Sequence, residues 1–345
     1  MNEVVIAAGT FEAGGESKRE VLQPMDIVTT AGATADLAAV LNTLPGTQTV
    51  GEQGRVFVRG GDGRETRTFI DGIAVLNEYS PSAPNTPSRS RFLPFMFKGI
   101  SFSTGGYSAE YGQALSSALI LNSKDESVTS RADLSLMSVG MDAAYTHAWD
   151  KASATAKIQY TNLTPYFNLV PQSMEWLEAP RSIEGAFAFR TRVNGNGMLK
   201  VYGNLNQSQF AYNEIPIEDP DVKVPVDLVN NYRYINVSYK NTISENWFLK
   251  TGASFSGNKD DIKIADSPSQ ISTQTWHAKA TLEHDMSDRI TFRFGSETFL
   301  PNAIEQTADT VLYIREFSSG IFGFYAEADF RISSFIALRA GRRFE

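Results

Sequence analysis

The chain has 345 residues, which at the usual domain size suggests two domains. Its 31 Lys and Arg against 39 Asp and Glu give a formal charge of −8. This balance argues against a nucleic-acid-binding protein, which needs a basic face for phosphates. The absence of cysteine excludes disulfides and thiolate metal sites, and the three scattered histidines predict no metal centre.

The N-terminus lacks a basic region followed by an apolar core, so we expect no signal peptide in this chain. No stretch approaches the roughly 18 apolar residues of a membrane-spanning helix. A transmembrane β-barrel stays possible, because its strands need only about 10 residues with every second one apolar.

Residues 1–125 predict a compact α/β domain. Thr34 can cap a helix that Pro45-Gly46 ends. Tight turns are expected at Gly60–Gly63 and Asp71-Gly72, and prolines mark an irregular loop over residues 77–95. Short strands are predicted at residues 56–59, 67–70, 100–103 and 118–122.

Residues 126–345 hold 29 of the 39 aromatic residues. Apolar and polar residues alternate over long runs, as in Trp276–Glu283 and Gly320–Ile332. This period of two predicts eleven or twelve strands and no amphipathic helix. Clusters typical of turns separate the runs, among them Ser256-Gly257-Asn258 and the residues from Asp285 to Asp288.

The same alternation fits a soluble β-sandwich or a transmembrane barrel. Three features favour the membrane. The runs are long, connections alternate between short (285–289) and long (210–230), and aromatic residues lie near run ends, as an interfacial girdle requires. The aromatic residues in question are Tyr232, Trp247 and Trp276.

Five segments of the first domain resemble the plug domain of TonB-dependent outer-membrane receptors, most closely those of Bacteroidota-type bacteria. They occur in the order and at about the spacing of that family. The segments are Leu44-Pro45-Gly46, Val56–Gly61, Phe69-Ile70-Asp71-Gly72, Gly105–Gly112 and Ser117–Lys124. The predicted fold is therefore an α/β plug domain, residues 1–125, followed by antiparallel transmembrane β-barrel strands, residues 126–345.

The resemblance implies a receptor in the Gram-negative outer membrane, surrounded by lipid. It would take up an external small ligand of unknown class without a cofactor, driven by a TonB-type periplasmic energy-transducing protein. The alternative is a β-rich cell-surface binding or adhesion module that does not transport. No catalytic motif is found, so an enzyme is not expected.

A family barrel has about 22 strands. Twelve strands would enclose only about 24 Å, which is too narrow for a 125-residue domain with a diameter near 35 Å. We therefore expect this chain to be a fragment, a plug with about half of a barrel. Its open edges would aggregate unless a partner chain or the missing half completes the barrel.

The resemblance also suggests roles for single residues. The segment Glu3, Val4, Val5, Ile6 and Ala7 is similar to the coupling segment offered to the periplasmic partner, although it also fits an ordinary first strand. A second set belongs to the plug motif and is expected to be structural. It comprises Pro45, Gly46, Arg59, Gly60, Asp71, Gly72, Gly106, Tyr111 and Gly112.

The loop Asn77–Arg91 is the candidate for ligand contact, with Asn77, Tyr79 and Arg89 as anchors; the alternative is a solvated linker. Many family members pair an Arg before the third predicted strand with barrel carboxylates. Here that Arg is absent, and Lys98 could replace it only as a point charge. The acidic clusters at 217–221 and 260–261 are expected to be solvated loops rather than calcium sites.

Overall fold

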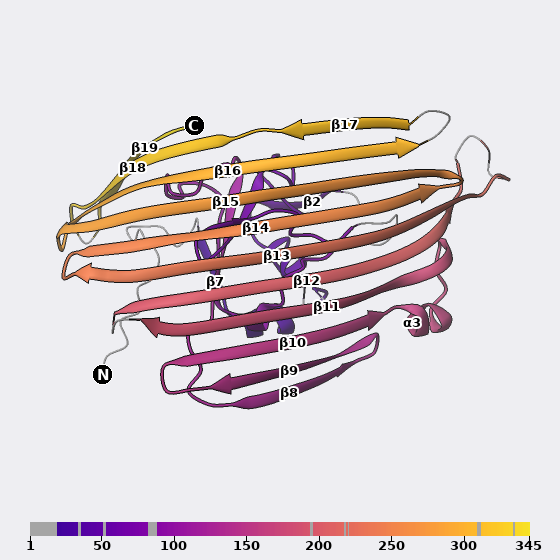
Figure 1. Ribbon diagram of the computed structural model, residues 1–345, viewed down its shortest axis with the longest axis horizontal. Coiled ribbons are helices and arrows are strands. Elements are labelled where there is room, and N and C mark those ends of the chain that lie inside the picture. The colour runs from indigo at the N-terminus through magenta and orange to yellow at the C-terminus, as the bar shows by residue number, and fades with distance from the viewer. Residues whose placement is uncertain are drawn as a thin grey trace.

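The computed structural model describes residues 19–33, 36–50, 53–81, 88–193, 196–216, 219, 221–308, 312–333 and 335–345. Figure 1 shows a small N-terminal domain behind a broad sheet of long antiparallel strands. We call the strands β8 to β19 of this sheet the wall. No helix in the described part of the chain has the length and apolar character needed to cross a membrane.

The N-terminal domain is built on a five-stranded sheet in the order β1-β6-β7-β4-β5, in which only β4 and β7 run parallel. A hairpin, β2 with β3, lies outside that sheet. The elements are β1 (Arg19–Leu22), α1 (Pro24–Thr29), α2 (Leu37–Leu41), β2 (Thr47–Val50), β3 (Gln53–Val58), β4 (Thr66–Ile70), β5 (Ile73–Val75), η1 (Pro94–Met96), β6 (Phe97–Ser103) and β7 (Ser117–Ser123).

The four strands predicted in this domain are present as β3, β4, β6 and β7. The predicted helix is also present, but it begins at Leu37, and Asp36 caps it by accepting the amide of Ala39 at 3.0 Å. Thr34, the predicted cap, lies outside the described residues. Asp36 is an equally good capping residue by chemistry, so local sequence could not choose between the two positions.

The wall contains twelve strands, each antiparallel to its neighbours. Strands β11 to β16 have 18 to 21 residues each. The first and last strands of the described order, β8 and β19, do not pair with each other. The elements are β8 (Arg131–Met137), β9 (Gly140–Ala148), β10 (Ala152–Asn162), α3 (Thr164–Leu169), β11 (Glu175–Val193), β12 (Gly197–Glu214), β13 (Val224–Ser244), β14 (Trp247–Ile264), β15 (Ser267–Ser287), β16 (Ile290–Ala308), β17 (Leu312–Ser318), β18 (Ile321–Arg331) and β19 (Ala337–Phe344).

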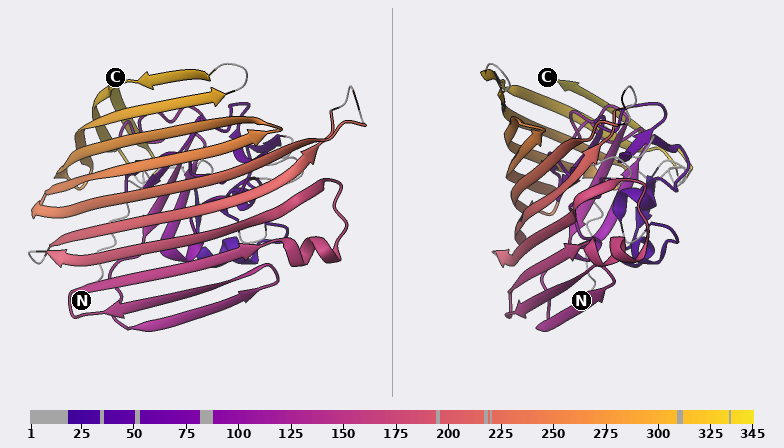
Figure 2. Two further views of the ribbon diagram at one scale, coloured as in Figure 1. Left: turned by 45° about the vertical axis from the view of Figure 1, so that its right-hand side comes forward. Right: turned by 90° about the vertical axis from the view of Figure 1, so that its right-hand side faces the viewer.

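The wall is curved, and the N-terminal domain lies on its concave side (Figure 2). Alternation along the strands sends polar side chains to this side and apolar ones away from it. In β15, His277 and Lys279 are buried beneath the N-terminal domain. The adjacent Trp276, on the opposite face of the strand, is 59% exposed. The apolar stripes thus face outward, as the transmembrane interpretation predicts and a soluble sandwich does not.

Aromatic side chains join the two parts into one core. Phe92 and Phe97 of the N-terminal domain pack against Tyr202 of the wall, with ring centroids 6.3 and 5.9 Å apart. Tyr234 lies edge-on to Phe92 at 5.9 Å. All four rings are almost fully buried, so the N-terminal domain is packed against the wall and not merely adjacent to it.

Several sequence expectations for the wall are wrong. Ser256-Gly257-Asn258 is not a turn but lies within β14, where Gly257 leaves room for the side chain of its cross-strand partner Arg233. The predicted long connection 210–230 is shorter, because β12 continues to Glu214 and β13 begins at Val224.

Two further differences between the sequence expectations and the structure depend on which side chains are buried. Helix α3 was not expected, because none of its residues is buried and it therefore shows no apolar periodicity. Tyr232 is not an interfacial aromatic residue: it is 2% exposed and faces the N-terminal domain.

Candidate functional site

The edge strand β5 of the N-terminal domain is bound along its free edge by wall side chains. The amide of Ala74 donates to His277 Nδ1 at 3.1 Å, and its carbonyl accepts from Ser254 at 2.9 Å. Leu76 repeats the pattern: its amide donates to Ser256 at 3.3 Å, and its carbonyl accepts from Tyr232 at 3.2 Å. An edge that would otherwise attract another strand is thus satisfied by side chains from β13, β14 and β15.

Arg91 lies at the centre of a second contact, which we call the amide cluster: Arg91, Asn206, Asn230, Tyr232 and Asn258. Its guanidinium donates to the side-chain oxygens of Asn206 at 2.8 Å, Asn230 at 2.9 Å and Asn258 at 3.5 Å. The guanidinium also lies 4.4 Å from the centre of the Tyr232 ring. Arg91 is 3% exposed, so these groups replace its water shell.

No described carboxylate touches Arg91 directly. Asp260 acts through the amides, because it accepts from Asn230 at 2.6 Å and from Asn258 at 2.9 Å. The Nε–H of Arg91 turns back to its own domain, donating to the carbonyls of Asn77 and Tyr79 at 3.0 and 2.9 Å. Burial lowers the pKa of Arg91, as expected for a cation held mainly by neutral groups.

A third contact, the charged cluster, surrounds Glu110. It consists of Glu110, Lys279, Glu283, Arg293 and Glu327. Lys279 Nζ lies 3.4 Å from the Glu110 carboxylate and 2.7 Å from its carbonyl, and Arg293 Nε is 3.9 Å from the carboxylate. Arg293 also pairs with Glu283 at 3.0 Å and with Glu327.

The electrostatics of Glu110 follow from this crowding. Burial raises its pKa, yet the cations Lys279, Lys250 and Arg293 outweigh burial and lower the pKa to about 2. The carboxylate is therefore ionised at every physiological pH, and the contact is a true ion pair.

The segment around Glu110 is held by its backbone as well. Glu327 accepts from the Ser108 hydroxyl at 2.9 Å and from the Ala109 amide at 2.8 Å, and Arg343 donates to the Ala109 carbonyl at 3.1 Å. A Cβ on Gly112 would meet the ends of the Arg343 and Glu297 side chains, which would have to shift to admit it. The predicted motif segment Gly106–Gly112 thus docks on β15, β16, β18 and β19.

Asp71 makes a further polar contact with the wall. Its carboxylate accepts from the Ser123 amide and hydroxyl at 3.1 and 2.6 Å and lies 3.7 Å from Lys200 of the wall. Burial raises the pKa of Asp71, but Lys200 and Lys240, with the Ser123 bonds, outweigh it and lower the pKa. Its φ of 53° places it in a left-handed turn with Gly72.

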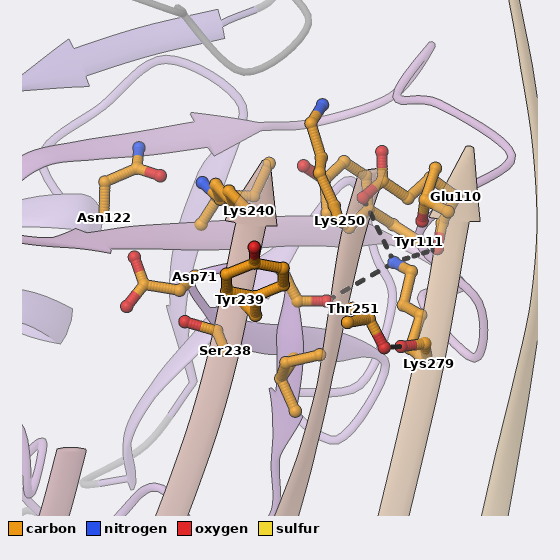
Figure 3. Close-up of a pocket in the computed structure, with 14 residues that line it drawn as sticks. Asp71, Glu110, Tyr111, Asn122, Ser238, Tyr239, Lys240, Lys250, Thr251 and Lys279 are labelled. Carbon is orange, nitrogen blue, oxygen red and sulfur yellow. Dashed lines mark hydrogen bonds and ion pairs between the residues drawn. The ribbon is translucent and has the colours of Figure 1, made fainter. Parts of the chain in front are cut away.

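A cavity of about 20 Å³ lies between Asp71, Glu110 and the wall, which is room for about one water. Figure 3 shows lysines from three neighbouring wall strands, Lys240, Lys250 and Lys279, beside the two carboxylates. No group of three or more His, Asp or Glu in the described residues is arranged to hold a metal ion. The described interface therefore consists of hydrogen bonds and ion pairs between the N-terminal domain and the wall.

The other predicted motif residues occupy turns. Gly46, Gly60, Gly72 and Gly106 have φ between 69° and 89°, which favours glycine, and Arg59 has φ 51°. Pro45 precedes Gly46 just after helix α2, and the Arg59 amide donates to the Gly46 carbonyl at 3.1 Å. Tyr111 packs on Phe69 with ring centroids 4.9 Å apart.

The three proposed ligand anchors do not lie together on one surface. Asn77 is exposed, donates to Thr273 of the wall at 3.0 Å and has φ 55°. Arg89 is half exposed and lies 3.7 Å from Asp36. The structure corrects the prediction for Tyr79: this residue belongs to the hydrophobic core of the N-terminal domain and does not present its ring to a ligand. Residues 82–87 of this loop lie outside the described residues.

The structure also bears on the predictions for Lys98 and for the acidic clusters. Lys98 pairs with Asp125 at 2.5 Å rather than with a wall carboxylate, so it does not replace the missing Arg. Asp260 is part of β14 and binds the amide cluster, so the 260–261 cluster is not a loop. The coupling segment Glu3–Ala7 and most of 217–221 lie outside the described residues.

Sequence reasoning missed the residues that carry the interface: Arg91, His277, Lys279, Arg293 and Arg343. The signal that could have found them is the phase of the alternation. Charged and amide residues on the polar phase of consecutive strands, at matching positions in the register, mark the face that meets another domain.

The described geometry can be compared with known proteins. Residues 17–118 match the family model for the TonB-dependent receptor plug domain. No curated protein matches the sequence. Three similar solved structures are a ferric-catecholate import receptor, Fiu, from E. coli K12 (TM-score 0.62, 11% identity), the ferric citrate transporter FecA (0.62, 12%) and the copper transporter OprC (0.66, 11%).

These likenesses cover 92%, 94% and 89% of this chain. The chain spans 68%, 62% and 51% of the three structures, so it matches only a part of each. At these identities the likeness shows the fold alone: a small N-terminal domain followed by a large antiparallel sheet of many strands, as in these three structures.

Proposed function

We propose, from the premise that residues 17–118 are a TonB-dependent receptor plug domain, that the chain acts in an outer-membrane receptor for TonB-coupled uptake of an external ligand. The observation that carries this proposal is the arrangement of the two parts. The plug fills the concave side of a wall whose exposed apolar side chains, such as Ile235, Trp276 and Phe324, point the other way, while buried tyrosines and polar groups face the plug. That arrangement suits a plugged pore in lipid and leaves a soluble module with a large exposed apolar face.

The outward face supports the placement in lipid. On β14 and β15, Trp247 pairs with His284 at one level and Phe255 pairs with Trp276 at another, eight residues further along β14. At about 3.3 Å per residue and a tilt near 40°, these levels are about 20 Å apart, close to the ~25 Å apolar band of outer-membrane barrels. Beyond Phe255 and Trp276 the outward residues of β14 and β15 carry no large apolar side chain: Gly257, Lys259 and Asp261 follow on β14 and Gln274 on β15.

The two ends of the wall differ in their longest connections, and we use this difference to assign its sides. The connections β13–β14 and β15–β16 at one end each leave only two residues between strands. At the other end β14–β15 also leaves two, but β10–β11 contains helix α3 and β12–β13 spans residues 215–223. Short turns face the periplasm in such barrels and long loops face the outside. The amide cluster lies nearer the long loops, so we place ligand contact there, with Asn77 and Arg89 as plug contacts.

The proposed mechanism needs no chemistry in this chain. The periplasmic partner would bind the segment Glu3–Ala7 by strand addition and pull on the plug, opening a path along the wall. For that path to open, the plug must give up contacts with the wall, of which the amide cluster and the β5 edge are the outermost.

A reversible tether tests whether the plug must move. The chain has no cysteine, so Asn77→Cys with Thr273→Cys would give a unique plug–wall disulfide. The control is Thr146→Cys with Thr155→Cys, which bridges two strands of the wall. In cells grown on candidate nutrients (ferric siderophores, cobalamin, oligosaccharides), we expect the first pair alone to block uptake until a reductant is added. Normal uptake with the tether closed would contradict the proposal.

The coupling segment is tested separately. Residues 1–8 are deleted, and binding of the purified periplasmic domain of the TonB-type protein is measured. We expect binding to be lost while the plug stays docked. Unchanged binding would remove the assignment of Glu3–Ala7 without affecting the receptor proposal.

A further inference from the structure

A hollow of about 640 Å³ is lined by residues of β10 to β15. It opens on the convex, outward face of the wall, as two observations show. No described residue of the plug lines it, although Asn206, Tyr232 and Asn258 touch Arg91 on the inner side. Each strand from β11 to β15 also contributes two outward-facing residues, such as Leu205 and Gln207, on either side of an inward-facing one. Its side chains are therefore those of the alternate, outward-facing positions.

The hollow is amphipathic. Its apolar residues Ile158, Ile183 and Leu205 are 55%, 46% and 63% exposed. Beside them lie the exposed polar side chains of Gln207, Asn231 and Gln274, and Gln207 is the cross-strand partner of Ile183. Gly185 has nothing within 4 Å of where a Cβ would be, so the hollow has open space at its floor.

The outward-facing charges of the hollow are both positive, in a chain whose net charge is −8. Arg233 is exposed and makes no ion pair with a described carboxylate; its guanidinium lies 5.5 Å from the centre of the Phe255 ring. Lys259 is 44% exposed and shares Asp261 at 3.0 Å, with Gln270 donating to the same carboxylate. Arg233 is thus a fixed cation directly above an aromatic residue of the lipid boundary.

We propose that this hollow binds the phosphate-bearing headgroup of a lipid in the surrounding leaflet, with Arg233 as the principal ligand and Lys259 as the second cation. Guanidinium and ammonium donors suit phosphate oxygens, and the amides of Gln207, Asn231 and Gln274 suit the remaining polar groups of a headgroup. The exposed Ile158, Ile183 and Leu205 favour a lipid over free phosphate, because they offer contact to acyl chains where a soluble anion has none. The inference rests on the proposed placement in the outer membrane.

The test compares the protein with the double variant Arg233→Gln/Lys259→Gln. Lys263→Gln is the matched control, since Lys263 lies on the same face of β14 beyond the hollow and pairs with Asp266 at 3.6 Å. Binding of phosphatidylglycerol and of a bis-phosphorylated glucosamine lipid to the protein in neutral detergent is counted by native mass spectrometry. Phosphatidylcholine and inorganic phosphate are the competing probes.

We expect preference for the anionic lipids to fall about fivefold for each cation removed and to be unchanged in Lys263→Gln. Equal binding by the double variant, or displacement of the lipid by inorganic phosphate alone, would overturn the inference. Quenching of tryptophan fluorescence by brominated acyl chains separates the two proposals. Quenching without headgroup preference refutes only the lipid site, and no quenching refutes the membrane placement itself.

Discussion

The amide cluster and the charged cluster hold the same plug to the same wall in two different ways. In the first, Arg91 is surrounded by three neutral asparagines and one aromatic ring. In the second, Glu110 lies among Lys279 and Arg293, which share further carboxylates. Both arginines are 3% exposed, so burial does not distinguish the clusters; the charge of their partners does.

This difference sets how costly each contact is to open. Separating Glu110 from its cations leaves charges of both signs unpaired in a low-dielectric interior. Removing Arg91 from the amide cluster leaves neutral amides that still bond to one another and to Asp260. We therefore expect the charged cluster to anchor the plug and the amide cluster to open first when the plug moves.

The largest effect is expected when the anchor loses its central charge. Glu110→Gln keeps the shape of the side chain but leaves Lys279 and Arg293 without this carboxylate, so the free energy of unfolding of the plug should fall by about 3–5 kcal/mol. Urea unfolding in detergent measures it. The control Asp62→Asn changes an exposed carboxylate of the same domain and should leave the midpoint unchanged. A Glu110→Gln plug as stable as the control would show that the anchor lies elsewhere.

The dependence of stability on pH gives a second test of the charged cluster. Because the pKa of Glu110 is lowered from its ordinary 4.5 to about 2, its ion pairs stabilise the folded state fully above about pH 4.5. That stabilisation is lost as the pH falls from 4.5 towards 2. Unfolding midpoints should therefore stay level between pH 7 and 5 and then drop. The drop should be smaller in Glu110→Gln, and an identical acid profile in both proteins would contradict the assignment.

The substitution Arg91→Lys tests the amide cluster. Lysine keeps the charge but lacks the planar fork that reaches three asparagines, so we expect a loss of about 1.5–3 kcal/mol, less than for Glu110→Gln. The plug should also become more susceptible to proteolysis in the segment that Arg91 ties to Asn77 and Tyr79. If Arg91→Lys proved as destabilising as Glu110→Gln, the distinction between the two clusters would fail.

Between the clusters, β5 meets the wall by close packing. A Cβ on Gly252 would lie 2.9 Å from the side chain of Ile73 and 2.6 Å from the Val237 carbonyl, so Gly252→Ala should cost about 1–3 kcal/mol through overpacking. Gly185→Ala, on an outward-facing position with no atom within 4 Å, is the matched control. Equal unfolding midpoints for the two alanine variants would mean that β5 does not fit tightly against β14.

Which features of the fold and the interface can be predicted depends on how far apart in the sequence the residues that form them lie. The wall strands follow from a local period of two, and the plug strands from short apolar runs bounded by Gly and Asp turns. The contacts between domains do not, because Arg91 meets Asn206 across 115 residues and Ala74 meets His277 across 203. Such pairs depend on strand register and on where one domain sits in the other, neither of which local sequence encodes.

Tyr232 shows the same limit. An aromatic residue near the end of an alternating run fits a lipid-facing girdle or a buried contact equally well, and only the phase relative to Asn230 and Tyr234 decides. Tyr79 and Lys98 show a related limit: each has suitable chemistry for the predicted role, but its contacts in the fold lie where local sequence cannot place them.

The smallest effect concerns Lys98, which lies where the resemblance to TonB-dependent receptor plugs predicts an arginine paired with the wall. Lys98 and Asp125 are 47% and 40% exposed, so their pair at 2.5 Å is screened by water and should contribute at most about 1 kcal/mol. Asp125 also has Lys200 at 2.8 Å, which keeps it paired when Lys98 is replaced. Lys98→Gln should therefore leave the unfolding midpoint of the plug nearly unchanged. A loss comparable to that of Glu110→Gln would move the anchor to β6 and reverse the ranking of the two clusters.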